Sequence, residues 1–220
     1  MNNSELAEIV WMKYAGLLGS EQIATKLALR LIAAQIDKTQ PKTILEIGSG
    51  IGTITELIIQ KSNSSKVVCY EINDWCLQRL RENITESRIL IIDSKEKLLE
   101  LNTQIDFLII DDWIDKNSTY ELIGNVSPKT IFVEGHRRQQ RLFVMQALKQ
   151  NGLRFRFENF KKSTDSYKGG CLITQQHASS LSQTRNLLFV LLTLGFSKIT
   201  ETRSRIPLRK LLKVPKQLGR

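Results

Sequence analysis

The sequence predicts an α/β fold: a seven-stranded, mainly parallel sheet with an antiparallel last strand and helices on both faces. After Pro41, short apolar runs alternate with helical segments, which is typical of parallel strands joined by crossover helices. The last two strand patterns follow each other without a helix between them, so they should pair antiparallel. The chain has 220 residues, 41% hydrophobic and 25% charged, which is the composition of a folded globular protein.

Two amphipathic helices are expected before the first strand. Residues 4–18 carry apolar side chains near helical spacing, namely Leu6, Val10, Tyr14 and Leu17. Ser20 is expected to open a second helix whose apolar positions are Ile23, Leu27, Leu31 and Ala34. These helices, within residues 1–40, are expected to cap the substrate side of a domain that spans residues 41–175.

The remaining elements follow from the alternation of short apolar runs and helical segments. Parallel strands are expected at residues 43–47, 66–70, 88–92, 105–110 and 129–133. A helix is expected over residues 139–150, and two further strands over 153–160 and 170–174. Residues 176–220 lie beyond the sheet pattern and are interpreted as a basic C-terminal extension.

Basic side chains are concentrated in the last part of the chain. Residues 1–128 hold 13 basic and 18 acidic side chains, a net charge of −5, whereas residues 129–220 hold 19 and 4, a net charge of +15. This asymmetry predicts an anionic partner for the C-terminal part. Residues 205–220 interleave leucines with basic side chains, a pattern typical of peripheral contact with an anionic membrane surface. A disordered solubilising tail is the alternative.

Cysteine usage and the N-terminus indicate the compartment. Cys69, Cys76 and Cys171 show no CxxC spacing and lie in apolar stretches, which predicts buried free thiols. The first residues lack a basic segment followed by an apolar one, so we expect a cytoplasmic protein. The longest strongly apolar run, residues 187–196, is about half of the ~20 residues that a membrane-spanning helix needs.

A glycine-rich turn follows the first predicted strand, with Gly48, Gly50 and Gly52 at alternate positions. Glycines let the chain turn sharply and expose backbone N–H groups to a ligand. The GxGxG spacing departs from the GxGxxG pattern of dinucleotide sites, and Glu46, just before the turn, would repel a diphosphate. A positively charged ligand suits this turn better. Glu71 ends the next strand, where a carboxylate can accept the hydroxyls of a ribose.

These features resemble the class I S-adenosylmethionine-dependent methyltransferases over about residues 20–175, and within them the small-molecule O-methyltransferases. The closing antiparallel hairpin is part of the likeness. The resemblance implies a Rossmann-like fold, methyl transfer, and S-adenosylmethionine as the cofactor. It also implies that the glycine turn holds the methionine end of the cofactor. Glu71 would then hold the ribose of the cofactor, and Asp93, after the third strand, would lie near its adenine. The implied cofactor-binding residues are Glu46, Gly48, Ser49, Gly50, Gly52, Glu71, Ile72, Asp93, Ser94 and Asp111.

Methyl transfer to a hydroxyl needs an aligned acceptor and a group that removes its proton. Strand four is followed by Asp111, Asp112 and Trp113. Asp111 resembles the acid that bridges the cofactor and the acceptor in small-molecule O-methyltransferases, and Asp112 and Trp113 are expected on the acceptor side. Trp113 closing the core over the cofactor is the alternative. His136, after strand five, is the candidate general base, because an unperturbed histidine has a pKa near ~6.5. A bystander surface histidine is the alternative.

Arg137 and Arg138 start the next helix, where the helix dipole disfavours cations. Guanidinium groups bind phosphate and carboxylate bidentately, so we expect both residues to bind an anionic acceptor, with a solvated basic face as the alternative. In metal-dependent O-methyltransferases an Asp-Asn pair follows strand five. Glu134 and Gly135 stand there in this chain, so one ligand is missing. A divalent ion on Asp111, Asp112 and Glu134 is therefore not favoured.

Three functions are compatible with the sequence. The favoured one is O-methylation of a small-molecule or glycan-type acceptor, anionic or lipid-linked. The second is RNA methylation, because residues 46–55 also look like ribosomal RNA adenine dimethylases. Those enzymes carry an Asn-Leu-Pro-Tyr type motif after strand four that residues 111–114 lack, so nucleic acid is the less favoured partner. The third is a non-catalytic cofactor-binding module. The sequence leaves the acceptor and the oligomeric state open.

Overall fold

The computed structural model describes residues 1–135, 137–161 and 169–176. His136 and the basic C-terminal extension from residue 177 onward lie outside the described residues, so the predictions made for them stay predictions. Residues Met1–Ala178 belong to one compact unit, which therefore includes both N-terminal helices.

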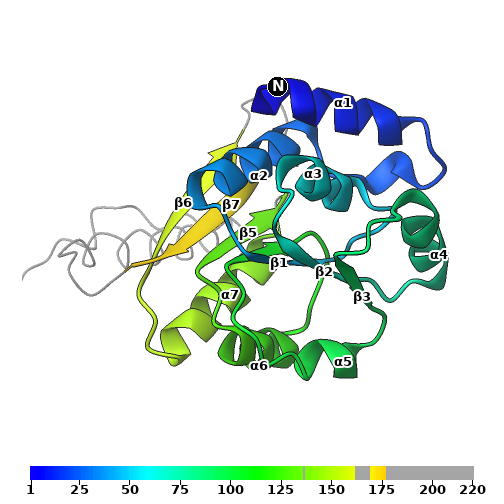
Figure 1. The fold of residues 1–220 in the computed structure, drawn as a ribbon. Helices are drawn as coiled ribbons and strands as arrows, with labels where there is room; N and C mark the ends of the chain where they lie inside the picture. Colours follow the sequence, from blue (N-terminus) through cyan, green and yellow to red (C-terminus); the bar gives the residue numbers. More distant parts are fainter. Residues whose placement is uncertain (136, 162–168, 177–220) are drawn as a thin grey trace, which may run out of the picture. The chain divides into compact units, whose positions relative to one another are not determined.

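Helices and strands alternate along the described chain, as predicted (Figure 1). The helices are α1 (Asn3–Ala15), the short 3₁₀ turn η1 (Ser20–Gln22), α2 (Lys26–Thr39), α3 (Thr53–Lys61), α4 (Asp74–Asn83), α5 (Lys95–Leu99), α6 (Lys116–Val126) and α7 (Arg138–Gln150). The strands are β1 (Thr43–Ile47), β2 (Lys66–Tyr70), β3 (Ile89–Ile92), β4 (Phe107–Ile110), β5 (Thr130–Glu134), β6 (Phe155–Lys161) and β7 (Gly169–Gln175).

The strands form one seven-stranded sheet in the order β3-β2-β1-β4-β5-β7-β6. The first five strands run parallel, whereas β7 pairs antiparallel with both β5 and β6. The predicted fold class is therefore confirmed. The order reverses between β1 and β4, and the ends of such strands are where open α/β sheets bind ligands.

Each face of the sheet has its own apolar core. One core joins α1, α2, α3 and part of α4 to the side chains of alternate strand residues. The other joins α5, α6 and α7 to the opposite face. Figure 1 shows these two helical layers on either side of the sheet. Along β1, Ile44 faces the first core and Leu45 the second, so Glu46 falls on the face covered by α1, α2 and α3.

The second helix begins later than predicted. Ser20 opens only η1, and Thr25 caps α2 by accepting a hydrogen bond from the Ala28 N–H at 3.2 Å. Of the predicted apolar positions, Ile23 and Leu31 are partly buried and pack against the core, Leu27 is partly buried and Ala34 is exposed. Helix α2 has apolar residues at neighbouring positions, so its sequence is compatible with two different, overlapping buried faces. The face that is buried comprises Ala28, Leu29, Ile32, Ala33, Gln35 and Ile36.

Two other expectations need correction. The first helix ends at Ala15, so Leu17 lies beyond it and is exposed. Cys69 and Cys171 are buried free thiols as predicted, but Cys76 is partly exposed because it lies in the first turn of α4. Among the helices of the described residues, none combines the length and the apolar character that a bilayer crossing requires.

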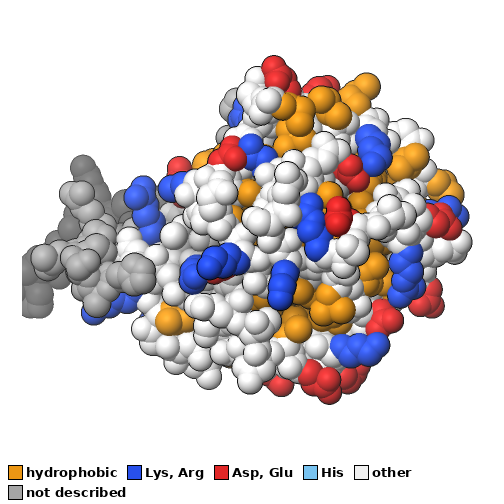
Figure 2. Space-filling view, viewed as in Figure 1, with side chains coloured by type: hydrophobic (Ala, Val, Ile, Leu, Met, Phe, Trp, Pro, Cys, Tyr) orange, Lys and Arg blue, Asp and Glu red, His pale blue; other side chains and the backbone are white. Residues whose placement is uncertain are grey.

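The surface seen in Figure 2 is mixed in charge, with lysines and arginines lying among aspartates and glutamates. Apolar side chains gather over α1 at the top of this view. Large exposed apolar residues of this region are Ile9, Met12, Leu17 and Leu18. The described basic side chains on the face shown do not gather into a single patch.

Candidate cofactor and acceptor site

The glycine turn between β1 and α3 combines left-handed backbone with close packing. Gly48 has φ +82°, and its N–H donates to the Tyr70 carbonyl at 2.8 Å. A Cβ at Gly48 would lie 2.3 Å from the Asp112 Cβ, so only glycine fits there. Gly50 also has a positive φ, +53°, but a Cβ there would meet no atom within 4 Å. The turn is thus tightly packed against Asp112 at Gly48, whereas the side of Gly50 on which a Cβ would lie is open. We call this open side the space above Gly50.

Glu46 is a completely buried carboxyl beneath this turn. Its Oε2 accepts a hydrogen bond from the Thr55 hydroxyl at 2.6 Å. Burial raises the pKa of the Glu46 carboxyl to about 7, with a smaller contribution from the negative charge of Glu71. Its second oxygen, Oε1, has no hydrogen-bond partner among the described residues, and neither do the nearby hydroxyls of Ser49 and Thr53. Buried polar atoms without partners indicate a position for a polar ligand or water.

Glu71 links the end of β2 to the glycine turn. Its Oε2 accepts the Gly50 N–H at 2.8 Å, and its Oε1 accepts the N–H groups of Ile72 and Asn73 at 2.9 and 2.8 Å. Three backbone donors therefore fix the orientation of the carboxylate. Ile72 beside it is a large apolar side chain with 57% of its surface exposed, which suits contact with a planar ring.

Asp93 and Ser94 follow β3, the neighbour of β2. The Asp93 carboxylate pairs with Lys97 Nζ at 2.7 Å and with an Arg81 nitrogen at 3.7 Å. Ser94 caps α5, since its hydroxyl accepts the Lys97 N–H at 3.3 Å. Both predicted residues therefore already make contacts, and their role toward a cofactor stays a prediction.

A buried charge cluster lies where β4 and β5 end, and consists of Asp111, Glu134 and Arg137. An Arg137 nitrogen donates to the Asp111 carbonyl and, at 3.0 Å, to its carboxylate Oδ1. The same nitrogen lies 4.0 Å from Glu134 Oε2. Burial raises the pKa of Asp111 well above its ordinary value, and the charge of Glu134 raises it further. Burial also raises the pKa of Glu134, whose carboxylate accepts a backbone hydrogen bond from Thr25 at the start of α2.

Asp112 and Trp113 continue from this cluster toward the surface. The Asp112 carboxylate accepts the Trp113 N–H at 2.6 Å. The Trp113 ring is 56% exposed and packs edge-on against Phe143 of α7, with ring centroids 5.6 Å apart. An exposed aromatic ring two residues after Asp111 can contact an acceptor ring. Its role in binding stays a prediction.

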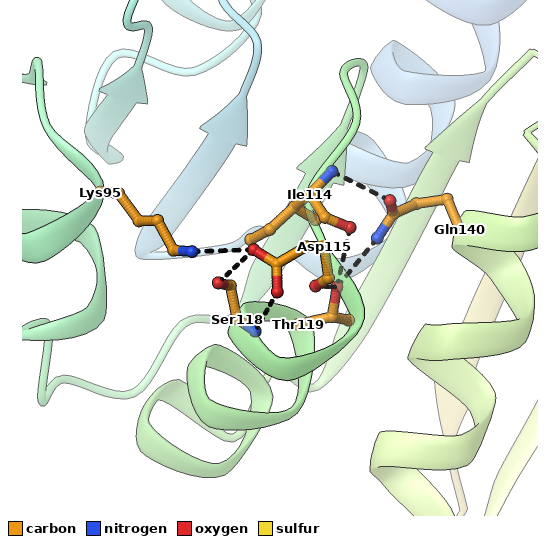
Figure 3. A network of polar contacts seen from close by, with 6 residues as sticks. All are labelled: Lys95, Ile114, Asp115, Ser118, Thr119 and Gln140. Atoms are coloured by element: carbon orange, nitrogen blue, oxygen red, sulfur yellow. Dashed lines mark hydrogen bonds and ion pairs between the residues drawn. The ribbon is translucent and has the colours of Figure 1, made fainter.

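A polar network that the sequence analysis missed holds the loop after Trp113 (Figure 3). Gln140 of α7 is fully buried; its Oε1 accepts the Ile114 N–H at 3.1 Å and its Nε2 donates to the Thr119 hydroxyl at 3.2 Å. Asp115 caps α6 by accepting the Ser118 N–H and hydroxyl at 3.1 and 2.6 Å, and it pairs with Lys95 at 2.9 Å. An Asp directly before a helical pattern is a helix-start signal that could have located this cap.

Replacing Gln140 with leucine is expected to loosen this loop. The Ile114 N–H would lose its buried acceptor, which costs about 1–3 kcal/mol of unfolding free energy, whereas the Thr119 hydroxyl would still donate to the Asp115 carbonyl at 2.8 Å. Chemical denaturation of the variant measures the loss. The matched control is Gln146→Leu on the same helix, because Gln146 is exposed and accepts only the Tyr120 hydroxyl. Equal effects of the two substitutions would contradict the importance of the network.

Four of the five parallel strands thus place their predicted residues along one edge of the sheet, and β5 adds Glu134. Arg138 makes contacts of its own, and its expected role stays a prediction. No group of three or more His, Cys, Asp or Glu side chains among the described residues is arranged to hold a metal ion. Sequence reasoning did not anticipate the inward position of Arg137, because spacing does not show where a side chain turns.

Comparison with known proteins supports the fold. No family model matches the sequence. A candidate O-methyltransferase from Klebsiella pneumoniae shares the fold with a TM-score of 0.57 at 18% identity, covering 78% of this chain and 90% of that one. An O-methyltransferase from Bacillus cereus, solved in complex with SAH (S-adenosylhomocysteine), gives a TM-score of 0.56 at 15% identity and covers 78% and 91%.

One curated protein is similar in sequence. It is the ribosomal RNA small subunit methyltransferase A of Mycoplasmopsis pulmonis, 27% identical over 89 residues. The match covers 40% of this chain but only 29% of that protein. The solved structures show the fold: the chain has the Rossmann-like fold of the class I S-adenosylmethionine-dependent methyltransferases.

Proposed function

We propose that this protein is an S-adenosylmethionine-dependent methyltransferase that methylates a hydroxyl of a small-molecule or glycan-type acceptor. The observation that carries the proposal is the row of acids at neighbouring strand ends: Glu46 on β1, Glu71 after β2, Asp93 after β3, and Asp111 after β4. The row lies at the edge of the sheet where ligands bind, around the point at which the strand order reverses.

The charges and contacts of the site fit this cofactor. Three buried or nearly buried acids, Glu46, Asp111 and Glu134, lie on this side of the sheet with the single guanidinium of Arg137 among them. Carboxyl groups outnumber the cation among these side chains, and a ligand bearing a sulfonium and an ammonium would favour their ionised forms. The open space above Gly50 and the unpartnered Oε1 of Glu46 lie where such a ligand would contact the turn.

Each residue then has a defined task. The backbone of the glycine turn and Glu46 would hold the amino-acid end of the cofactor, Glu71 its ribose, and Ile72 with Asp93 its adenine. When bound, the cofactor supplies a methyl group on a sulfonium for in-line displacement. Asp111 would accept the proton of the acceptor hydroxyl, because its raised pKa makes its carboxylate a stronger base. His136 is the second candidate for that proton.

The acceptor class rests on fewer observations. Trp113, two residues after Asp111, offers an exposed ring, which suits a sugar or aryl acceptor. An anionic or lipid-linked acceptor would need cations, and the guanidinium of Arg137 already pairs with two carboxylates. Arg138 and the basic C-terminal extension are therefore the groups that we propose for an anionic acceptor or an anionic membrane surface.

Two measurements test the function. Calorimetry should show binding of S-adenosylmethionine and S-adenosylhomocysteine, and absence of both would end the proposal. Transfer of a labelled methyl group into the small-molecule fraction of a cell extract should then occur, and Asp111→Ala should reduce it about 10²- to 10⁴-fold, the usual contribution of a general base. His136→Ala distinguishes the two candidate bases. If both variants keep full turnover, the assignment of the base is wrong.

RNA methylation is the second candidate, favoured by the sequence match to the ribosomal RNA methyltransferase. Against it, the acids Asp111 and Asp112 at the acceptor side would repel a phosphate backbone. Labelled transfer that occurs only in the RNA fraction would favour this candidate. Cofactor binding without transfer in any fraction would instead indicate a non-catalytic module.

A further inference from the structure

The buried cluster of Asp111, Glu134 and Arg137 contains two acids in direct register. Ile110 of β4 pairs with Val133 of β5, so the next residues along the two parallel strands are Asp111 and Glu134. Neighbouring strands are about 4.8 Å apart, and both side chains lie on the same face of the sheet. Two buried carboxylates at this separation repel each other unless a cation or a shared proton lies with them.

Arg137 provides that cation from within the chain. Gly135, directly after β5, has φ +65°, and the Arg137 guanidinium reaches the end of β4, where it lies 3.0 Å from the Asp111 carboxylate. One guanidinium nitrogen contacts both the carbonyl and the carboxylate of Asp111 and lies 4.0 Å from the Glu134 carboxylate. A guanidinium stays charged at every pH at which the protein folds.

We propose that Arg137 is a positioning residue that serves as the built-in cation of the Asp111–Glu134 pair, in the place that a divalent metal ion would otherwise take. The donor set agrees, because no group of three or more His, Cys, Asp or Glu side chains in the described part of the chain is arranged to hold a metal ion, and Arg137 pairs with both carboxylates. The importance of the pair for catalysis rests on the proposed methyl transfer. The claim about the cation does not, and can be tested by thermal unfolding without any measurement of activity.

The test uses three variants of the full chain and thermal unfolding with added cations. Arg137→Ala removes the cation and leaves space, Arg137→Met removes it and fills the space, and Arg137→Lys keeps a charge. We expect Arg137→Ala to lower the Tm by about 5–10 °C, because two buried carboxylates lose their partner. Millimolar Mn²⁺ or guanidinium should restore part of this loss in Arg137→Ala, but should leave the wild type and Arg137→Met unchanged.

Other outcomes decide against the proposal. It is wrong if the wild type itself is stabilised by Mn²⁺, or if neither cation restores Arg137→Ala. If Arg137→Ala does not fold, a double-mutant cycle of Glu134→Gln and Arg137→Met replaces it. Loss of Arg137 should then lower the Tm clearly less in the Glu134→Gln background, and equal losses in both backgrounds would refute the pairing. Failure to bind S-adenosylmethionine would affect the proposed function but none of these results.

Discussion

Gly50→Ala is expected to weaken binding of S-adenosylmethionine by ~10- to 100-fold, which corresponds to about 1.4–2.8 kcal/mol, while the protein stays folded. A methyl group at Gly50 meets no protein atom within 4 Å, so it would project into the space above the turn. The fold loses only the ~1–2 kcal/mol that a side chain costs at a positive φ. Isothermal calorimetry measures the affinity, and denaturant unfolding measures the stability.

Gly152→Ala is the matched control for this substitution. Gly152 follows α7, has φ +68°, and a Cβ there also meets nothing within 4 Å. It should therefore show the same small loss of stability with unchanged cofactor affinity. If both variants bind the cofactor as the wild type does, the space above Gly50 is not the binding site. Gly48→Ala is expected to behave differently, because its Cβ would collide with Asp112 and disturb the fold itself.

Glu46→Gln is expected to change how stability depends on pH. Burial raises the pKa of Glu46 from 4.5 to about 7, so the folded protein binds a proton that the unfolded chain has already released. Between these two pH values the folded state therefore loses stability as the pH rises. The loss should total about 3 kcal/mol at pH 8 relative to pH 4, at 1.36 kcal/mol per pKa unit.

Glu46→Gln removes this titration, so its stability relative to the wild type should increase from pH 4 to pH 8. Denaturant unfolding at several pH values measures the difference in unfolding free energy between the variant and the wild type. Asp111 and Glu134 titrate in both proteins, so their contributions to this difference largely cancel. Glu121→Gln, an exposed glutamate on α6, is the control and should follow the wild type. A constant difference between Glu46→Gln and the wild type over this range would contradict the assignment.

The same substitution should change cofactor binding. A cationic cofactor favours the ionised form of Glu46, so binding below pH 7 should release a proton and become tighter as the pH rises. In Glu46→Gln the affinity should be lower and this contribution to the pH dependence should be absent. Calorimetry in buffers with different ionisation enthalpies counts the released protons. An unchanged proton count in the variant would show that another group titrates on binding.

The sequence predicted the sheet well because its signals are local. Runs of apolar, β-branched residues bounded by turns predict both ends of β1 and β2 correctly. The strand predicted at residues 105–110 ends with β4 but begins two residues before it. There, Asp106 is not part of β4: its carboxylate accepts the N–H groups of Lys42 and Thr43 at 2.8 and 3.1 Å, before the strand begins. Such a long-range contact leaves no local pattern.

The site was predictable in its positions and less so in its contacts. The acids at the strand ends could be placed, because the register of a parallel sheet brings them to one edge. The direction of Arg137 depends on the positive φ of Gly135 and on the carboxylates of a neighbouring strand. Gln140 accepts a hydrogen bond from the N–H of Ile114, which lies 26 residues earlier in the sequence. Both are properties of the tertiary structure and are not encoded in spacing.

The position of β7 constrains the order in which the sheet can assemble. β6 pairs with β7 alone, while β7 lies between β6 and β5. During synthesis β6 leaves the ribosome first, yet it has no partner in the sheet until the later strand arrives. The two strands must therefore dock as a preformed hairpin or one after the other with β7 leading. A chain released before residue 169 would expose the flank of β5, a ready template for self-association.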